Sequence, residues 1–249
     1  MVFRIVAHRG VTAAAPENTM AAFTTALELG IDAVELDVRL TRDHRPAVYH
    51  YFYLDDFTTA SGPIFARSAT DLDGVRVVDR RRSQGHRIPM LEEVLDEFAG
   101  RLGLEIELKG PEPEAAKVVG ELLARYRSSW ERMEVTSFEP ALLTSLPTEC
   151  RGITTALLFP RSEPWMRPDV VAYAAMQRAR LAGAAAVHLD PSQLSAEGVA
   201  TIRAAGIEVH AHSVNDVASL ELAAALTLPW ICSDEPEQAL RFRRQRESS

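Results

Sequence analysis

Residues 33–39 read Ala33-Val34-Glu35-Leu36-Asp37-Val38-Arg39, a short apolar strand interrupted by two acids. Side chains alternate between the two faces of a strand, so Glu35 and Asp37 point one way and their apolar neighbours the other. Burial of two adjacent carboxylates without a partner is energetically costly. A hard divalent cation would remove this conflict, because it binds carboxylate oxygens. The alternative is a solvated strand edge with two surface acids. The pattern of the remaining sequence distinguishes these two interpretations.

The composition indicates a large core and an acidic surface. The chain has 249 residues, 47% of them hydrophobic, and a formal net charge of −8. This charge argues against a general nucleic-acid binder, which needs a basic face, but it allows a small anionic substrate in a cleft. The two cysteines, Cys150 and Cys232, do not make a disulfide framework, so a reducing cytoplasm is the expected location. We expect neither a secretory signal nor a membrane span, because we find no apolar segment long enough for either.

Strand-like and helix-like segments alternate along most of the chain. The predicted strands are 3–7, 33–38, 47–50, 102–109, 133–136, 152–158, 184–189, 207–214 and 230–232. Apolar residues at helical spacing follow most of these strands, and Asn18 is expected to cap the first helix. About eight such units in about 250 residues favour a closed (β/α)₈ TIM barrel. A doubly wound sheet is the second choice, because a Gly-rich dinucleotide loop is missing after the first strand. We therefore predict a single domain over residues 1–249.

Residues 51–88 interrupt the alternation. The stretch is irregular and contains Ser61-Gly62-Pro63 and the charged run Asp79-Arg80-Arg81-Arg82. A structureless segment of this length is uncommon in a compact domain unless it has a function. We therefore predict a small insertion after strand two that covers the mouth of the active site.

Polar residues collect at the predicted C-terminal ends of the strands, where TIM barrels carry their chemistry. These candidates are His8, Arg9, Glu35, Asp37, His50, Glu107 and Lys109. The three acids are oxygen ligands, which favour Mg²⁺ or Ca²⁺ over zinc. The two histidines can exchange protons near neutral pH, and the two basic side chains suit a phosphate. Together they indicate phosphodiester cleavage, in which one oxygen loses a proton, another gains one and charge develops on the phosphoryl oxygens.

Other polar strand residues have a structural interpretation. A lone histidine at the end of a strand is more often structural than catalytic, so we assign His188 and His210 to structural roles. Glu105 lies on the same strand face as Glu107, and we expect it to form hydrogen bonds inside the barrel.

An ordered set of short motifs extends from residue 8 to residue 236. The motifs are His8-Arg9-Gly10, Pro16-Glu17-Asn18-Thr19, Glu35-Leu36-Asp37-Val38, Thr41-Arg42-Asp43, His50, Ile88-Pro89-Met90-Leu91-Glu92-Glu93, Glu107-Leu108-Lys109, Ser137-Phe138, Val214-Asn215 and Ser233-Asp234-Glu235-Pro236. In these residues the chain resembles the glycerophosphodiester phosphodiesterases. The resemblance implies a barrel with a small insertion after strand two. The implied roles are metal ligation by Glu35, Asp37 and Glu107, acid–base catalysis by His8 and His50, and phosphate contacts from Arg9 and Lys109.

The predicted activity is the metal-dependent hydrolysis of glycerophosphodiesters to glycerol 3-phosphate and an alcohol, with Mg²⁺ or Ca²⁺ as cofactor. The protein would thus be a phosphoric diester hydrolase of lipid and glycerol metabolism, without a nucleic-acid partner and without stable membrane insertion. Two alternatives are a lysophospholipase D-like phosphodiesterase and a non-catalytic barrel that binds phosphodiesters. The preferred alcohol and the oligomeric state are left open.

Two positions depart from the pattern of the family that the chain resembles. An acid usually follows the second histidine, and here Tyr51 stands there, so another group has to orient His50. A Trp usually precedes the Thr-Val-Asn of strand seven, and here His212 takes its place before Ser213. We predict that His212 forms part of the wall around the leaving alcohol. Because a charged imidazole would repel choline, we expect the preference for neutral alcohols to sharpen as the pH falls.

Overall fold

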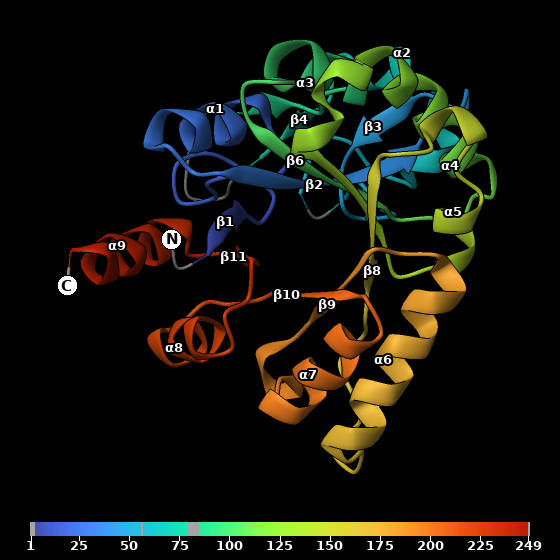
Figure 1. The fold of residues 1–249 in the computed structure, drawn as a ribbon. Coiled ribbons are helices and arrows are strands. Elements are labelled where there is room, and N and C mark those ends of the chain that lie inside the picture. The colour runs from blue at the N-terminus through green and yellow to red at the C-terminus, as the bar shows by residue number, and fades with distance from the viewer. Residues whose placement is uncertain (1–2, 56, 79–84, 249) are drawn as a thin grey trace.

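The computed structural model describes residues 3–55, 57–78 and 85–248. Within them one nine-stranded sheet has the order β1-β11-β10-β9-β8-β7-β6-β2-β3, and β1 also pairs with β2, which closes the sheet into a barrel (Figure 1). The strands of the closed ring are parallel, whereas β3 pairs antiparallel with the C-terminal half of β2. The predicted TIM barrel with an insertion after strand two is therefore confirmed.

The strands and helices follow one another in the predicted alternation. The strands are β1 (Arg4–Ala7), β2 (Ala33–Leu40), β3 (Pro46–Val48), β4 (Arg76–Val77), β5 (His86–Arg87), β6 (Gly103–Leu108), β7 (Met133–Ser137), β8 (Thr154–Leu158), β9 (Ala186–Leu189), β10 (Glu208–Ala211) and β11 (Trp230–Ser233). The α-helices are α1 (Met20–Leu29), α2 (Ala69–Leu72), α3 (Leu91–Phe98), α4 (Glu114–Leu123), α5 (Pro140–Thr144), α6 (Pro168–Ala182), α7 (Ala196–Ala204), α8 (Val217–Ala225) and α9 (Pro236–Glu247). Short 3₁₀ helices cover Ile64–Ala66, Ala124–Arg132, Thr148–Cys150 and Pro191–Gln193.

Strand β2 is buried on both of its faces. All eight of its residues are buried, because one face packs on the helices and the other faces the barrel interior. Val34, Leu36 and Val38 belong to the main hydrophobic core. Glu35 and Asp37 point into the barrel, where they lie in register with Glu105 and Glu107 of β6. The interpretation as a solvated strand edge is therefore wrong.

Several predicted boundaries differ from those in the structure. Thr19, and not Asn18, caps α1, because its hydroxyl accepts a hydrogen bond from the backbone of Ala22. The strand predicted at 47–50 ends at Val48, so His50 lies beyond the strand. The strand predicted at 207–214 ends at Ala211, and His212 therefore begins the loop that follows β10.

The segment 51–88 has a small hydrophobic core of its own in its described part. Leu54, Ile64, Leu72 and Val77 are buried there together with Tyr49. A two-stranded sheet of β4 and β5 forms one side of the segment. Residue 56 and the charged run at 79–82 lie outside the described residues. None of the described helices is long and apolar enough to cross a membrane.

Candidate active site

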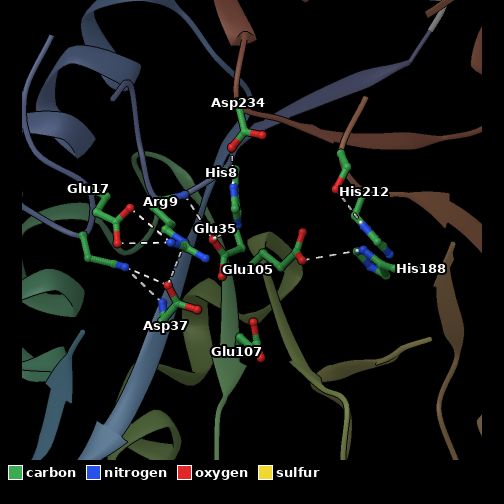
Figure 2. Close-up of polar contacts among 12 residues, drawn as sticks. His8, Arg9, Glu17, Glu35, Asp37, Glu105, Glu107, His188, His212 and Asp234 are labelled. Atoms are coloured by element: carbon green, nitrogen blue, oxygen red, sulfur yellow. Dashed lines mark hydrogen bonds and ion pairs between the residues drawn. The ribbon is translucent and has the colours of Figure 1, made fainter. Parts of the chain in front are cut away.

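Three carboxylates converge inside the C-terminal half of the barrel. Glu35 and Asp37 lie on β2 and Glu107 on β6, and at least one oxygen of each lies within 4.8 Å of the others. Their side chains are buried, and Asp37 is completely inaccessible. Figure 2 shows the three acids approaching one another from the two neighbouring strands. The strand periodicity in the sequence thus brings these residues together as predicted.

Two cations partly compensate this negative charge. Arg9 Nε lies 3.1 Å from Asp37 Oδ2, and Lys109 Nζ lies 2.9 Å from Glu107 Oε1 and 3.4 Å from Asp37 Oδ1. Burial alone would raise the pKa of Asp37, but Arg9 and Lys109 hold it below its ordinary value. Burial and the charges of Asp37 and Glu107 raise the pKa of Glu35 well above its ordinary value. Burial and Asp37 also raise the pKa of Glu107 to about 7.

The three acids fit a divalent cation. Glu35 Oε1 and Asp37 Oδ1 are buried and have no hydrogen-bond partner among the described residues, and Asp37 Oδ1 has only the 3.4 Å ion pair with Lys109. Buried polar atoms normally form hydrogen bonds, so these two oxygens are available to coordinate an ion. The set contains oxygen ligands and neither sulfur nor nitrogen, which is the chemistry of Mg²⁺ and Ca²⁺ sites.

His8 is held by a chain of hydrogen bonds that starts at the end of the last strand. Its Nδ1 lies 2.5 Å from Asp234 Oδ1, and Asn215 Nδ2 donates to Asp234 Oδ2 at 2.6 Å. The other ring nitrogen, Nε2, lies 3.8 Å from Glu35 Oε2, so it faces the acid cluster. The Asp234 carboxylate can only accept a hydrogen bond, so it fixes Nδ1 as a ring nitrogen of His8 that carries a proton.

Asp234 and Asn215 had no assigned role in the sequence analysis. Both belong to motifs that the chain shares with the family that it resembles, and this was the available signal. His8 and Asp234 are 226 positions apart, and only the pairing of β1 with β11 brings them together.

His50 lies beside the acids in a different environment. Its Nδ1 is buried without a hydrogen-bond partner in the part of the chain that the structure describes, and its ring meets the Tyr51 ring edge-on at 4.6 Å. Arg39 Nε donates to the His50 carbonyl at 2.7 Å, so the backbone at this position is fixed. Burial, reinforced by Lys109 and other cations, lowers the pKa of His50 to about 4. Arg39 was quoted in the sequence analysis without a role.

Two residues of the segment 16–19 form hydrogen bonds with Asp37 and with its partner Arg9. Asn18 has a positive φ of 56° and bonds Asp37 twice, since its Nδ2 donates to Oδ2 at 2.7 Å and its Oδ1 accepts from the Asp37 backbone at 3.1 Å. Glu17 accepts two bonds of 3.1 Å from Arg9 Nη1. Asn18 is thus a positioning residue for Asp37, which explains why it does not cap the helix.

His212 is half-buried at the start of the loop after β10. Its Nδ1 lies 3.1 Å from Ser213 Oγ, and its Nε2 has no hydrogen-bond partner within residues 3–55, 57–78 and 85–248. Burial, together with the nearby His188, lowers the pKa of His212 to about 4. The expectation that His212 charges in mildly acidic solution is therefore wrong, because its imidazole stays neutral down to about pH 4.

Comparison with known proteins adds independent information. Residues 8–238 match the model of the glycerophosphoryl diester phosphodiesterase family. YhdW of Bacillus subtilis (strain 168), provisionally named a glycerophosphodiester phosphodiesterase, is 31% identical over 94% of this chain and 95% of its own length. A glycerophosphodiester phosphodiesterase of Caldanaerobacter subterraneus is 32% identical over 65% of this chain and 69% of its own length.

Solved structures show the same fold. A phosphodiesterase of Oleispira antarctica, in complex with the product sn-glycerol-3-phosphate, has a TM-score of 0.78 and 26% identity, and the match covers 96% of this chain and 95% of that chain. A structure from Agrobacterium tumefaciens has a TM-score of 0.84 at 21% identity, with 99% of both chains covered. At 21% identity the Agrobacterium tumefaciens structure supports the fold alone.

Proposed function

Because the chain belongs to the glycerophosphoryl diester phosphodiesterase family, we propose how its own residues hydrolyse a glycerophosphodiester to glycerol 3-phosphate and an alcohol. The observation that carries the proposal is the buried acid trio with two unpartnered oxygens beside His8. Glu35, Asp37 and Glu107 would hold Mg²⁺ or Ca²⁺. When bound, such an ion supplies positive charge that stabilises phosphoryl oxygens and lowers the pKa of a coordinated hydroxyl or water.

We assign the role of general base to His50 and the role of general acid to His8. The pKa of His50 is lowered by burial and by the nearby cations, so its imidazole is neutral and ready to accept a proton. Asp234 holds His8 Nδ1, which orients the ring so that Nε2 faces the acid cluster. This difference in environment separates the two roles.

In the proposed reaction His50 removes the proton of the attacking oxygen, and this oxygen forms a new bond to phosphorus. The bond between phosphorus and the alcohol oxygen breaks. His8 gives its proton to the departing alcohol. The two histidines have the same roles whether the attacking oxygen belongs to water or to a glycerol hydroxyl. Attack by the glycerol hydroxyl would give a cyclic phosphate first.

Arg9 and Lys109 are assigned to the phosphoryl oxygens. Both lie at the edge of the acid cluster, with side chains 15% and 12% exposed, so they can reach a bound anion. Glu17 and the Oδ2 atom of Asp37 already orient the guanidinium of Arg9. Burial alone would lower the pKa of Lys109, but Asp37 and Glu107 raise it above its ordinary value and keep it charged.

The insertion 51–88 and His212 are proposed to contact the leaving alcohol. Support comes from the placement of Tyr51 and Phe52, whose rings lie 6.0 Å from the Arg9 guanidinium and 3.7 Å from that of Arg39. The side chains of Phe52, Phe57 and Phe65 are more than one-third exposed, so this segment also offers an apolar surface for the acyl chain of a lysophospholipid. This observation keeps the lysophospholipase D-like activity as a second candidate.

One experiment separates the candidate functions. The purified protein is assayed with glycerophosphoglycerol, glycerophosphocholine and lysophosphatidylcholine, each with Mg²⁺, with Ca²⁺ and with excess EDTA. We expect release of glycerol 3-phosphate that EDTA abolishes and that the Glu35→Gln variant lacks. Full turnover in EDTA would refute the metal role, faster cleavage of lysophosphatidylcholine would favour the second candidate, and binding without turnover would identify a non-catalytic barrel.

The compartment and the metabolic context are inferences from the chemistry. A cytoplasmic location rests on the cysteine content alone. A place in lipid and glycerol metabolism follows from the substrate and the product of the proposed reaction.

A further inference from the structure

A second polar cluster lies in the barrel interior next to Glu105, an inward-facing residue of β6. It consists of Glu134 on β7, His188 on β9 and His210 on β10. His188 Nε2 lies 2.9 Å from Glu134 Oε2 and 3.0 Å from His210 Nδ1, and His210 Nδ1 lies 3.6 Å from Glu134 Oε1. Three strands that are distant in the sequence thus aim one ligand atom each at a common point.

The spacing of these atoms is that of metal ligands. Four ligands at about 2.0–2.1 Å from a tetrahedral Zn²⁺ lie roughly 3.3 Å from one another. His188 Nε2 lies 2.9 Å from Glu134 Oε2 and 3.0 Å from His210 Nδ1, and His210 Nδ1 lies 3.6 Å from the other Glu134 oxygen, Oε1. A metal ion bound by these side chains would replace the hydrogen bonds that join them. Two imidazole nitrogens and one carboxylate are a set that suits Zn²⁺ and neighbouring transition metals, and it differs from the oxygen-only set of the catalytic acids.

The distal nitrogens of both histidines face carboxylates. His188 Nδ1 lies 3.6 Å from Glu105 Oε1 (Figure 2), and His210 Nε2 lies 3.4 Å from Glu208 Oε2. A carboxylate near the distal nitrogen is common behind metal-binding histidines. At His188 the 3.6 Å contact is an ion pair and not a hydrogen bond. His188 is 1% exposed, and its Nδ1 has no hydrogen-bond partner among the residues described by the structure.

A cavity connects this cluster to solvent at the N-terminal end of the barrel. Its volume is about 750 Å³, and Glu105, Glu134, Glu208 and His210 are among its lining residues. The remaining wall includes the first residues of several strands, such as Arg4, Ala33, Gly103 and Trp230. An ion can therefore reach the cluster without passing through the catalytic end of the barrel.

We propose that Glu134, His188 and His210 bind a divalent transition-metal ion, best represented by Zn²⁺, in the barrel interior beside Glu105 and separate from the three catalytic acids. The ion links β7, β9 and β10 through the barrel interior and stabilises the folded chain, because it binds the native state and not the unfolded one. The site shares no ligand with the acid trio, so Zn²⁺ binding can be tested separately from the proposed hydrolysis.

A proton on the His210 ring competes with a metal ion for the ring nitrogen. Burial alone would lower the pKa of His210, but Glu134 raises it to about 9. A metal ion that enters the cluster has to displace this proton, so the proposal needs a direct measurement of metal binding.

The experiment uses a chain whose catalytic acids are neutralised by Glu35→Gln and Asp37→Asn, freed of metal by EDTA and dialysis. We expect isothermal titration with Zn²⁺ at pH 8 to show one site per chain, with a matching rise in melting temperature. His210→Gln should weaken Zn²⁺ binding at least 100-fold, and Glu208→Gln about 10–100-fold, as for other carboxylates behind a histidine ligand. His44→Gln, which replaces an exposed histidine of the β2–β3 turn, is the matched control and should leave the affinity unchanged.

X-ray absorption of the Zn²⁺-loaded wild-type chain provides a test that does not depend on any variant. Two imidazole ligands give a characteristic multiple-scattering pattern, whereas the catalytic trio offers oxygens only. An oxygen-only pattern would overturn the proposal. So would the absence of a Zn²⁺ site in the neutralised chain with a native circular-dichroism spectrum, or Zn²⁺ binding that His210→Gln and Glu134→Gln leave intact.

Discussion

Replacement of Glu107 by Gln should stabilise the metal-free protein at alkaline pH while it destroys the catalytic metal site. Glu107 is buried next to Asp37, and Lys109 is its nearest cation. When the metal is removed, its carboxylate remains in a site that already contains the charges of Asp37 and Glu35. Gln keeps the size of the side chain and removes the charge, so it tests this conflict directly.

The size of the effect follows from the pKa of Glu107. Burial and the charge of Asp37 raise this pKa from 4.5 to about 7. Each tenfold change in acidity corresponds to about 1.4 kcal/mol, so ionised Glu107 lowers the free energy of unfolding by about 3 kcal/mol. The folded chain binds the proton more tightly than the unfolded chain. The penalty from ionised Glu107 is therefore absent below pH 4.5, grows as the pH rises towards 7 and is complete above that value.

The assay is urea unfolding in excess EDTA at pH 5 and pH 8. Groups outside the acid cluster titrate equally in both proteins, so the difference between wild type and Glu107→Gln reports this carboxyl group together with its coupling to Glu35 and Asp37. We expect the difference to move by about 2–3 kcal/mol in favour of the variant between pH 5 and pH 8. The matched control is Glu221→Gln, an exposed position on α8, for which no such change is expected.

Saturating Mg²⁺ or Ca²⁺ should reverse the order of stability. An ion at about 100 times its dissociation constant adds about 2.7 kcal/mol to the wild type, and the variant should gain less. The reasoning is refuted if the difference between the two EDTA-treated proteins is the same at pH 5 and pH 8. It is equally refuted if the cation stabilises both proteins to the same extent.

Four further predictions concern activity. His8→Ala and His50→Ala should each lower kcat about 10²–10⁴-fold without a change in the circular-dichroism spectrum, and near-normal kcat in His50→Ala would assign the base elsewhere. Asp234→Asn should lower kcat less than His8→Ala and leave KM unchanged, whereas a rise in KM alone would contradict its orienting role. Shortening the 51–88 insertion should alter the kcat/KM ranking of leaving alcohols more than the metal affinity, and an unchanged ranking would refute this. His212→Trp should shift kcat/KM severalfold towards glycerophosphocholine relative to glycerophosphoglycerol, from a cation–π contact of about 0.5–2 kcal/mol, and an unchanged ratio would place position 212 away from the alcohol.

The barrel and its acid trio could be predicted because both depend on local periodicity. The alternation in Ala33–Leu40 places Glu35 and Asp37 on one face, and the alternation in Gly103–Leu108 does the same for Glu105 and Glu107. Repeated strand–helix units require parallel strands, and eight of them in one chain of this length close into a barrel. Each of these steps needs only residues that are near one another in the sequence.

The partners of the functional residues depend on register and closure, which local patterns do not determine. Asp234 meets His8 because β11 closes the barrel against β1. Asn18 was expected at the helix cap, a local role, but its side chain binds Asp37 on the neighbouring strand. Likewise, His188 and His210 are single histidines in the sequence, and the pairing of β9 with β10 makes them neighbours.

The two polar clusters lie in different surroundings within the barrel interior. The acid trio lies towards the C-terminal ends of β2 and β6, the end at which TIM barrels bind their substrates, so an ion bound there is expected to meet a substrate. Deeper in the barrel, Glu134 and the two histidines lie on the strands themselves, and strand pairing fixes their separations. Because all three side chains come from strands and none from a loop, an ion bound there would cross-link the sheet. We therefore expect such an ion to stabilise the fold, whereas an ion at the acid trio would serve the proposed hydrolysis.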